Sequence, residues 1–112
     1  WDGQPSTEDG SLWLDHLGRL PSLLGGLPLY LTEFGVMAGE TRYRIMDAEG
    51  AAAVWRRAIK ASCDVGARQL VAYQWDPNPP GTDPSRWDTS ILGHGRTPTP
   101  ALGVFAAADC SP

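Results

Sequence analysis

The sequence lacks a long apolar segment, and its cysteines and basic residues are few. No apolar run approaches the roughly 20 residues that a membrane-spanning helix requires, so we expect no membrane partner. Nine lysines and arginines stand against 13 acidic residues and are mostly scattered, which argues against a nucleic acid partner. The two cysteines, Cys63 and Cys110, are too few and too far apart for the spacing of a metal site.

The length and composition allow one ordinary globular domain. The chain has 112 residues, of which 42% are hydrophobic and 20% are charged, a balance typical of folded proteins. It begins with Trp1, and no basic start followed by an apolar run is present, so neither an initiator methionine nor a signal peptide is visible. We therefore expect a processed or excised piece of a longer protein.

Residues 27–36 (LPLYLTEFGV) are the most informative stretch. Their alternating positions are nearly all apolar on both faces, which is typical of a strand in a parallel sheet that is covered on both sides. Gly35 permits a turn, so the pattern predicts a strand from about Leu29 to Phe34. Ligands bind at the carboxyl ends of the strands in parallel α/β sheets, and Glu33 would lie at that edge.

A second short apolar run, residues 69–75 (QLVAYQW), predicts another strand, which ends at Trp75. Between the two strands, residues 37–46 are predicted to be a polar loop, and a helix with one apolar face follows a cap at Asp47. Consecutive parallel strands that are joined by a helix point the same way. Trp75 would therefore reach the same edge of the sheet as Glu33.

Another amphipathic helix is predicted near the beginning of the chain. The apolar residues within residues 12–24 recur at helical spacing. Pro21 should kink or restart this helix, because a proline inside a helix removes a hydrogen bond and clashes with the previous turn. Gly25 and Gly26 then end it.

The remainder of the chain is predicted to be a long loop and a last helix. Residues 76–96 are rich in proline and glycine, and a loop of this length favours a functional role. Thr99 is a suitable cap and Pro100 a suitable first residue for a helix that runs to about Ala108.

The predicted order of helix, strand, helix, strand, helix is that of a parallel α/β fold. Two parallel strands are too few for an independent sheet, since both would be edge strands with unpaired backbone groups and uncovered apolar faces. We therefore predict that the chain is the closing portion of a larger repeating β/α domain and that the rest of that domain is needed for folding.

Three motifs resemble the C-terminal part of a clan A glycoside hydrolase, a cellulase-like (β/α)8 TIM barrel. Residues 27–36 are similar to its seventh strand, and residues 70–77 (LVAYQWDP) are similar to its eighth. Residues 86–108 (RWDTSILGHGRTPTPALGVFAAA) resemble the loop and helix start that follow. The resemblance covers nearly the whole chain and implies an incomplete barrel over residues 1–112.

The resemblance implies that Glu33 is the catalytic nucleophile of a retaining glycosidase. In such enzymes one carboxylate attacks the anomeric carbon, and a second carboxyl group roughly 5 to 5.5 Å away protonates the leaving oxygen and later activates water. Trp75 would be a flat platform for a sugar ring, with Trp87 and Asn78 as further substrate-binding residues. The implied substrate is an oligo- or polysaccharide, and no cofactor or metal is expected.

One element of the family pattern is absent. The acid/base glutamate of the family follows an asparagine at the end of the fourth strand, but this chain has no Asn-Glu pair, and its only asparagine is Asn78. Glu40 and Asp76 could each be proposed as that acid, although a loop-shaping role suits Asp76 better. We therefore expect the isolated chain to be inactive.

Each candidate residue also has a structural interpretation. Glu33 could pair with an arginine such as Arg42 or Arg44, and Trp75 could fill the core. The residues that could simply pack within their loop are Asn78, Trp87 and His94.

Other functions and features stay open at the level of the sequence. A non-catalytic carbohydrate-binding module would use Trp75 and Trp87 for stacking, and a small α/β interaction domain is a third possibility. In a barrel, Cys63 and Cys110 would lie at helix ends on the same face, so a disulfide between them is a hypothesis. We expect the parent protein to be extracellular.

Overall fold

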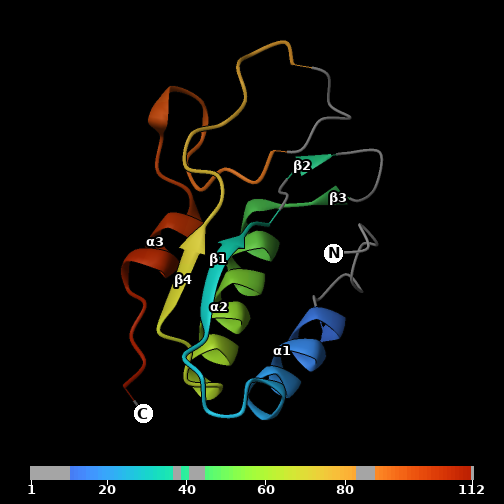
Figure 1. Ribbon diagram of the computed structural model, residues 1–112. Helices are drawn as coiled ribbons and strands as arrows, with labels where there is room; N and C mark the ends of the chain where they lie inside the picture. Colours follow the sequence, from blue (N-terminus) through green and yellow to red (C-terminus); the bar gives the residue numbers. More distant parts are fainter. Residues whose placement is uncertain (1–10, 37–38, 41–44, 83–87, 112) are drawn as a thin grey trace.

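The computed structural model describes residues 11–36, 39–40, 45–82 and 88–111 (Figure 1). The elements are α1 (Ser11–Leu24), β1 (Tyr30–Phe34), β2 (Gly39–Glu40), β3 (Ile45–Met46), α2 (Ala48–Asp64), β4 (Gln69–Ala72), the 3-10 turn η1 (His94–Arg96) and α3 (Pro100–Ala106). The strands β1 and β4 pair in parallel, which confirms the predicted α/β class and the order of its main elements. The short strands β2 and β3 form a separate antiparallel pair, so the prediction of a loop throughout residues 37–46 is wrong.

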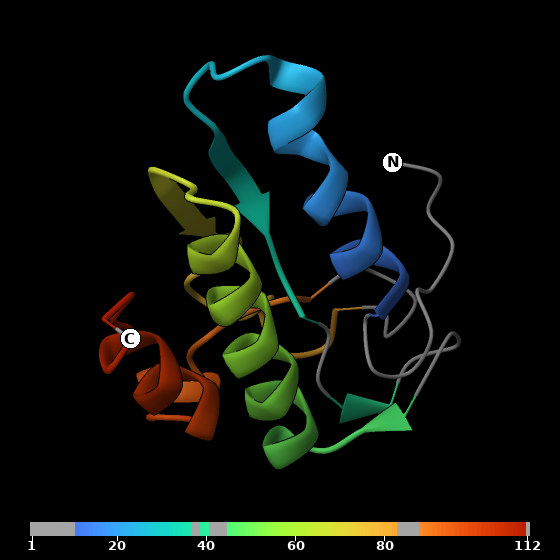
Figure 2. The same cartoon turned by 90° about the horizontal axis from the view of Figure 1, so that it is seen from below.

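Helix α2 is the centre of the molecule and lies between α1 and α3 (Figures 1 and 2). Its N-terminus is capped as predicted, because the Asp47 carboxylate accepts a hydrogen bond from the Gly50 amide at 2.7 Å. The buried side of α2 carries Ala51, Ala52, Val54, Trp55, Ala58 and Ser62. The other side of the helix is exposed and carries Arg56, Arg57 and Lys60, so the predicted single apolar face is confirmed.

Among the described residues, Trp55 is the largest buried side chain, and it anchors the core. Its ring packs against two phenylalanine rings in T-shaped arrangements. The centroid distance is 4.9 Å to Phe34 of β1 and 5.6 Å to Phe105 of α3. Such T-shaped pairs add to the stabilisation that burial alone provides. Ile91, from the long loop after β4, is also completely buried in this cluster. The core therefore joins a strand, two helices and a loop.

Helix α1 runs through Pro21 without a break, so the predicted restart is not observed. Gly25 and Gly26 follow the helix with positive φ angles of 59° and 88°, which confirms that glycines end it. Leu17 is buried, but Leu23 on the predicted apolar side is 78% exposed. The described residues therefore cover only part of the apolar face of α1.

Helix α3 begins as predicted and is fixed at both ends. The Thr99 hydroxyl oxygen accepts a hydrogen bond from the Leu102 amide at 3.2 Å, and Pro100 occupies the first turn. The helix ends at Ala106, two residues earlier than expected. Beyond it, Cys110 is disulfide-bonded to Cys63 at the end of α2, with a Cα–Cα distance of 5.3 Å, so the hypothesis of a bridge is confirmed.

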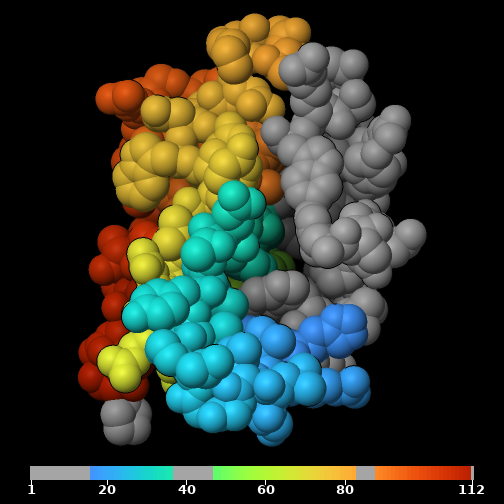
Figure 3. All heavy atoms as spheres, viewed as in Figure 1, coloured from blue at the N-terminus to red at the C-terminus, as the bar shows by residue number. Residues whose placement is uncertain are grey.

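One face of the β1–β4 sheet packs against the core, and the other is uncovered within the described part of the chain. Phe34, Leu70 and Ala72 contact the buried cluster, whereas Tyr30 and Tyr73 are both 54% exposed. Figure 3 shows residues of both strands, in cyan and yellow, at the surface. The prediction that both faces of residues 27–36 are buried is therefore wrong for this chain, because no described element covers the second face.

No helix among the described residues is both long and apolar enough to cross a bilayer.

Candidate active site

Glu33 lies in a β-bulge near the carboxyl end of β1. Leu31 pairs with Leu70 and Phe34 with Ala72, so two residues of β1, Thr32 and Glu33, stand opposite a single residue of β4. Thr32 and Glu33 are both exposed. A bulge bends its strand and can re-aim a side chain, and bulges are frequent next to active sites. Here it presents the Glu33 carboxylate to solvent on the side away from the core.

The Glu33 carboxylate makes no hydrogen bond or ion pair with the residues that the structure describes. Arg42 and Arg44, the partners of the structural alternative, lie outside the described residues. Within the described part, Glu33 is therefore accessible to a ligand.

Trp75 lies just beyond β4, at the same edge of the sheet as Glu33. The two strand ends are joined there, because the Tyr73 amide donates a hydrogen bond to the Phe34 carbonyl oxygen at 2.8 Å. The Trp75 side chain is 51% exposed, so it is not a core residue within the described structure. The parallel pairing of β1 and β4 thus places Glu33 and Trp75 at the same edge of the sheet.

Tyr73 is a second aromatic residue at this edge, which sequence reasoning missed. Leu70 and Ala72 contact the core, so alternation along the strand places Val71 and Tyr73 on the uncovered face. The exposure of Tyr73 agrees with this placement. The alternation of side chains within residues 69–75 is the signal that identifies Tyr73, but the apolar character of the run draws attention only to Trp75 at its end.

Asn78 is held inside the loop after β4. Its backbone amide donates to the Asp88 carboxylate at 2.8 Å, and its side-chain oxygen accepts a hydrogen bond from the Gln74 carboxamide at 3.2 Å. The Asp88 carboxylate also accepts from the Ser90 amide at 3.0 Å. Asn78 therefore shapes the loop. Trp87, the other predicted substrate-binding residue of this loop, lies outside the described residues.

Opposing effects act on the pKa of the Asp88 carboxyl group. Its partial burial would raise its pKa. Hydrogen bonds from the Ser90 side chain and from the amides of Asn78 and Ser90, together with the charge of His94, outweigh burial and lower the pKa below its ordinary value. The ionised form is therefore the one that holds the loop.

Asp76 and Arg96 form an exposed ion pair that links the two ends of the long loop. The distance between Asp76 Oδ1 and Arg96 Nε is 3.3 Å. This contact agrees with the loop-shaping role expected of Asp76, and exposed pairs of this kind stabilise by only about 0.2 to 1 kcal/mol. His94 is exposed in η1, and the side chain of Glu40 lies outside the described part.

Gly35 allows the two strand ends to approach a returning segment of the loop. A Cβ atom at this position would overlap the Tyr73 carbonyl oxygen and the Thr89 side chain. Thr89 is 4% exposed, and its hydroxyl donates a hydrogen bond to the Tyr73 carbonyl oxygen. The predicted turn glycine is thus required by a close contact.

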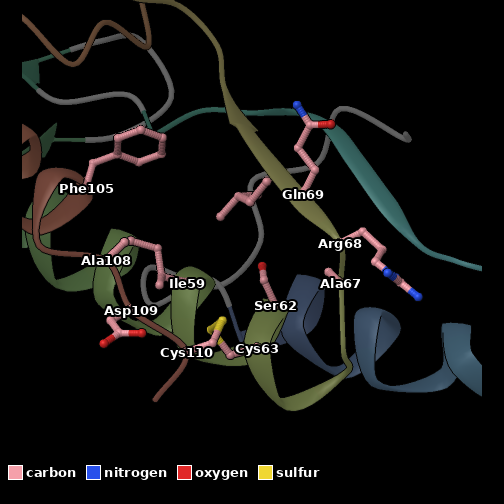
Figure 4. A pocket seen from close by; sticks show the side chains of 11 residues that line it. Ile59, Ser62, Cys63, Ala67, Arg68, Gln69, Phe105, Ala108, Asp109 and Cys110 are labelled. Atoms are coloured by element: carbon pink, nitrogen blue, oxygen red, sulfur yellow. A yellow bond between two sulfur atoms is a disulfide. The ribbon is translucent and has the colours of Figure 1, made fainter.

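A cavity of about 310 Å³ lies at the opposite end of the sheet (Figure 4). Its lining includes Ile59, Leu70 and Phe105, with Arg68 at the start of β4 and the Cys63–Cys110 disulfide beside it. It is remote from Glu33 along β1 and β4, so the candidate site is an open edge and not this cavity. Among the described residues, no group of three or more His, Cys, Asp or Glu could hold a metal ion.

The chain matches no protein-family model, no curated protein and no solved structure.

Proposed function

We propose that this chain is the nucleophile-bearing end of a retaining glycoside hydrolase of clan A, with Glu33 as the nucleophile. The observation that carries the proposal is the β-bulge that exposes Glu33 at the carboxyl edge of β1, the edge at which the exposed aromatic residues Tyr73 and Trp75 follow β4. A carboxylate that pairs with no described residue, at the same edge as exposed aromatic rings, suits a sugar substrate, because the C–H faces of a sugar ring pack well on such rings.

The reaction would be a double displacement. The Glu33 carboxylate attacks the anomeric carbon and forms a covalent glycosyl ester while the glycosidic bond breaks and the leaving oxygen takes a proton from a second carboxyl group. That group then removes a proton from water, which hydrolyses the ester and restores Glu33. Because the chain has no Asn-Glu pair, the acid/base residue would come from another part of the parent protein.

The rest of the barrel would supply what the two strands lack. In a (β/α)8 barrel, the inner face of every strand is covered by side chains from other strands. The uncovered face with Tyr30 and Tyr73, and the incompletely covered face of α1 with Leu23, are the surfaces that such neighbours would fill. The disulfide suits an oxidising compartment, and an extracellular location is part of the proposal.

The test is Glu33→Gln in the complete parent protein, with Glu49→Gln on the exposed start of α2 as the matched control. Hydrolysis is measured on a panel of 4-nitrophenyl glycosides and on soluble polysaccharides. We expect Glu33→Gln to lower kcat by a factor on the order of 10⁴ or more, because an amide is not a nucleophile at the anomeric carbon, and Glu49→Gln to leave it unchanged.

A second readout is independent of the loss of rate. With a slowly released aryl glycoside, mass spectrometry of the unmodified protein should find a glycosyl adduct on the peptide that contains Glu33. Unimpaired turnover by Glu33→Gln, or an adduct on another residue, would remove the nucleophile assignment.

The half-exposed Trp75 also favours a second candidate function, a non-catalytic carbohydrate-binding module that uses Trp75 and Trp87. That function predicts that the 112-residue chain alone binds oligosaccharides, with a change in tryptophan fluorescence that is lost in Trp75→Ala. The hydrolase fragment should bind weakly and melt without a cooperative transition.

A further inference from the structure

A short segment of the long loop returns to the ends of both strands. The Ile91 amide donates to the Gln74 carbonyl oxygen at 3.1 Å, and the Leu92 amide donates to the Trp75 carbonyl oxygen at 3.2 Å. Ile91 is completely buried and Leu92 is 7% exposed. Residues 88–92, which we call the return segment, therefore lie against the extension of β4 that carries Trp75.

Thr89 is the member of the return segment that touches both strands. Its hydroxyl donates to the Tyr73 carbonyl oxygen, two residues before Trp75. Its side chain also lies against Gly35, two residues after Glu33, so closely that a Cβ atom on Gly35 would not fit. The side chain is almost completely buried.

We propose that Thr89 is a positioning residue that fixes the spacing between Glu33 and the aromatic residues at the end of β4. The inference rests on the proposed function of Glu33. Thr89 itself touches no reacting atom in this arrangement and acts through the backbone of Tyr73 and Gly35.

Both parts of the threonine side chain contribute to this role. The hydroxyl holds the Tyr73 carbonyl, beside the backbone bonds that the Ile91 and Leu92 amides make to Gln74 and Trp75. The branched Cβ restricts χ1, so the hydroxyl stays aimed at its acceptor. Asp88 holds the neighbouring turn through Ser90 and Asn78, and the Thr99 hydroxyl donates to the Ile91 carbonyl oxygen, so the segment is anchored on both sides of Thr89.

The experiment compares three variants of the complete parent protein: Thr89→Val, which keeps the shape and removes the donor, Thr89→Ser, which keeps the donor, and Thr97→Val as the control. Thr97 is exposed, and its hydroxyl donates to the His94 carbonyl oxygen at 3.1 Å. The Thr97→Val variant therefore lacks a similar hydrogen bond, but one away from the strand ends. The substrate is the 4-nitrophenyl glycoside that the unmodified protein hydrolyses fastest.

We expect Thr89→Val to lower kcat by about 10- to 100-fold with little change in KM, because a displacement of about 1 Å between the Glu33 carboxylate and the anomeric carbon of the bound sugar costs rates of this order. Thr89→Ser should restore most of the rate, and Thr97→Val should leave it unchanged. Near-UV circular dichroism and the melting temperature identify variants that are folded at the assay temperature.

If Thr89→Val does not fold, Thr89→Ala replaces it, since alanine adds no methyl group against the carbonyl and differs from serine only by the hydroxyl. The positioning role would be overturned if the folded variant without the donor, Thr89→Val or Thr89→Ala, had the same kcat as Thr89→Ser. This holds whether both variants are fast or both are slow. Full activity of Glu33→Gln would overturn the proposed function, whereas a loss there with an unaffected Thr89→Val overturns only this inference.

Discussion

Asp88 is the residue that closes the base of the loop after β4. Its two carboxylate oxygens accept hydrogen bonds from the amides of Asn78 and Ser90, ten residues back and two residues forward. Neutralising the carboxyl group would weaken both bonds, because hydrogen bonds to an ionised acceptor are stronger than those to a neutral one. The shape of the loop thus depends on one ionised side chain.

The lowered pKa of Asp88 predicts how its contribution depends on pH. A carboxyl group whose pKa is lower in the folded state than in the unfolded state stabilises the fold when it is ionised. This stabilisation is complete at pH values above the ordinary pKa of about 3.9. It is lost as the pH falls through the lower pKa of the folded state. Asp88→Asn should therefore lower the melting temperature of the protein at pH 6, and the difference should shrink between pH 4 and pH 2.

The matched control is Asp76→Asn, which removes an exposed ion pair and should cost no more than about 1 kcal/mol. Melting temperatures followed by circular dichroism across this pH range provide the comparison. A constant difference between Asp88→Asn and the unmodified protein down to pH 2 would show that the carboxyl charge of Asp88 is not responsible.

At the scale of the elements, α3 is a short helix that depends on its cap. It has seven residues, against 17 in α2, and isolated helices of this length are not stable. The Thr99 side chain makes two bonds: it accepts from the Leu102 amide and donates to the Ile91 carbonyl oxygen. The cap of α3 therefore also attaches the helix to the return segment.

Thr99→Ala is expected to cost more than Asp47→Ala, the corresponding change at α2. Loss of an N-cap costs about 1 kcal/mol. Loss of the second bond of Thr99 adds about 1 kcal/mol, because the carbonyl oxygen of the buried residue Ile91 loses its donor. Denaturant unfolding of the protein measures both variants, and Thr99→Ser, which keeps both bonds, should be nearly neutral. A larger cost for Asp47→Ala would contradict this role of Thr99.

The elements that the sequence predicts correctly are those with local signals. Asp47 and the Thr99-Pro100 pair mark helix starts, and the glycines after α1 mark its end, because caps depend only on a few neighbouring residues. The two strands follow from their short apolar runs. Their common edge follows from the parallel order, which is why Glu33 and Trp75 were expected together.

The features that sequence reasoning missed depend on partners far away in the chain. The bulge at Thr32 and Glu33 exists only relative to the register with β4, and Thr89 contacts Tyr73 across 16 residues. Ile91 lies in a stretch rich in glycine and proline, yet it is completely buried. The expectation that β1 is covered on both faces is wrong because a covering element is missing: the described part of the chain contains none for its second face.

At the scale of the whole molecule, the disulfide joins the ends of α2 and α3 over a sequence separation of 47 residues. A crosslink that closes a loop of this size stabilises by at most about 4 kcal/mol through the lower entropy of the unfolded chain. The double variant Cys63→Ser and Cys110→Ser should therefore unfold at a lower denaturant concentration than the unmodified protein, and reduction of the unmodified protein should produce the same shift.

Mass spectrometry after unfolding in an alkylating reagent, with and without reductant, tests the bond directly. We expect two alkylated thiols only after reduction. Two thiols alkylated without reductant would contradict the bond, and a reductant effect of equal size on the double variant would show that the shift has another cause.

The bond between Cys63 and Cys110 also makes β4, the long loop and α3 part of one closed covalent ring. A protease that cuts the exposed Pro79–Gly81 stretch within this ring opens the chain but does not divide it into two molecules. The nicked protein would keep Glu33 on one side of the cut and Thr89 on the other, still connected through the far end of the sheet. Loop cleavage and loss of α3 are therefore separate events in this molecule.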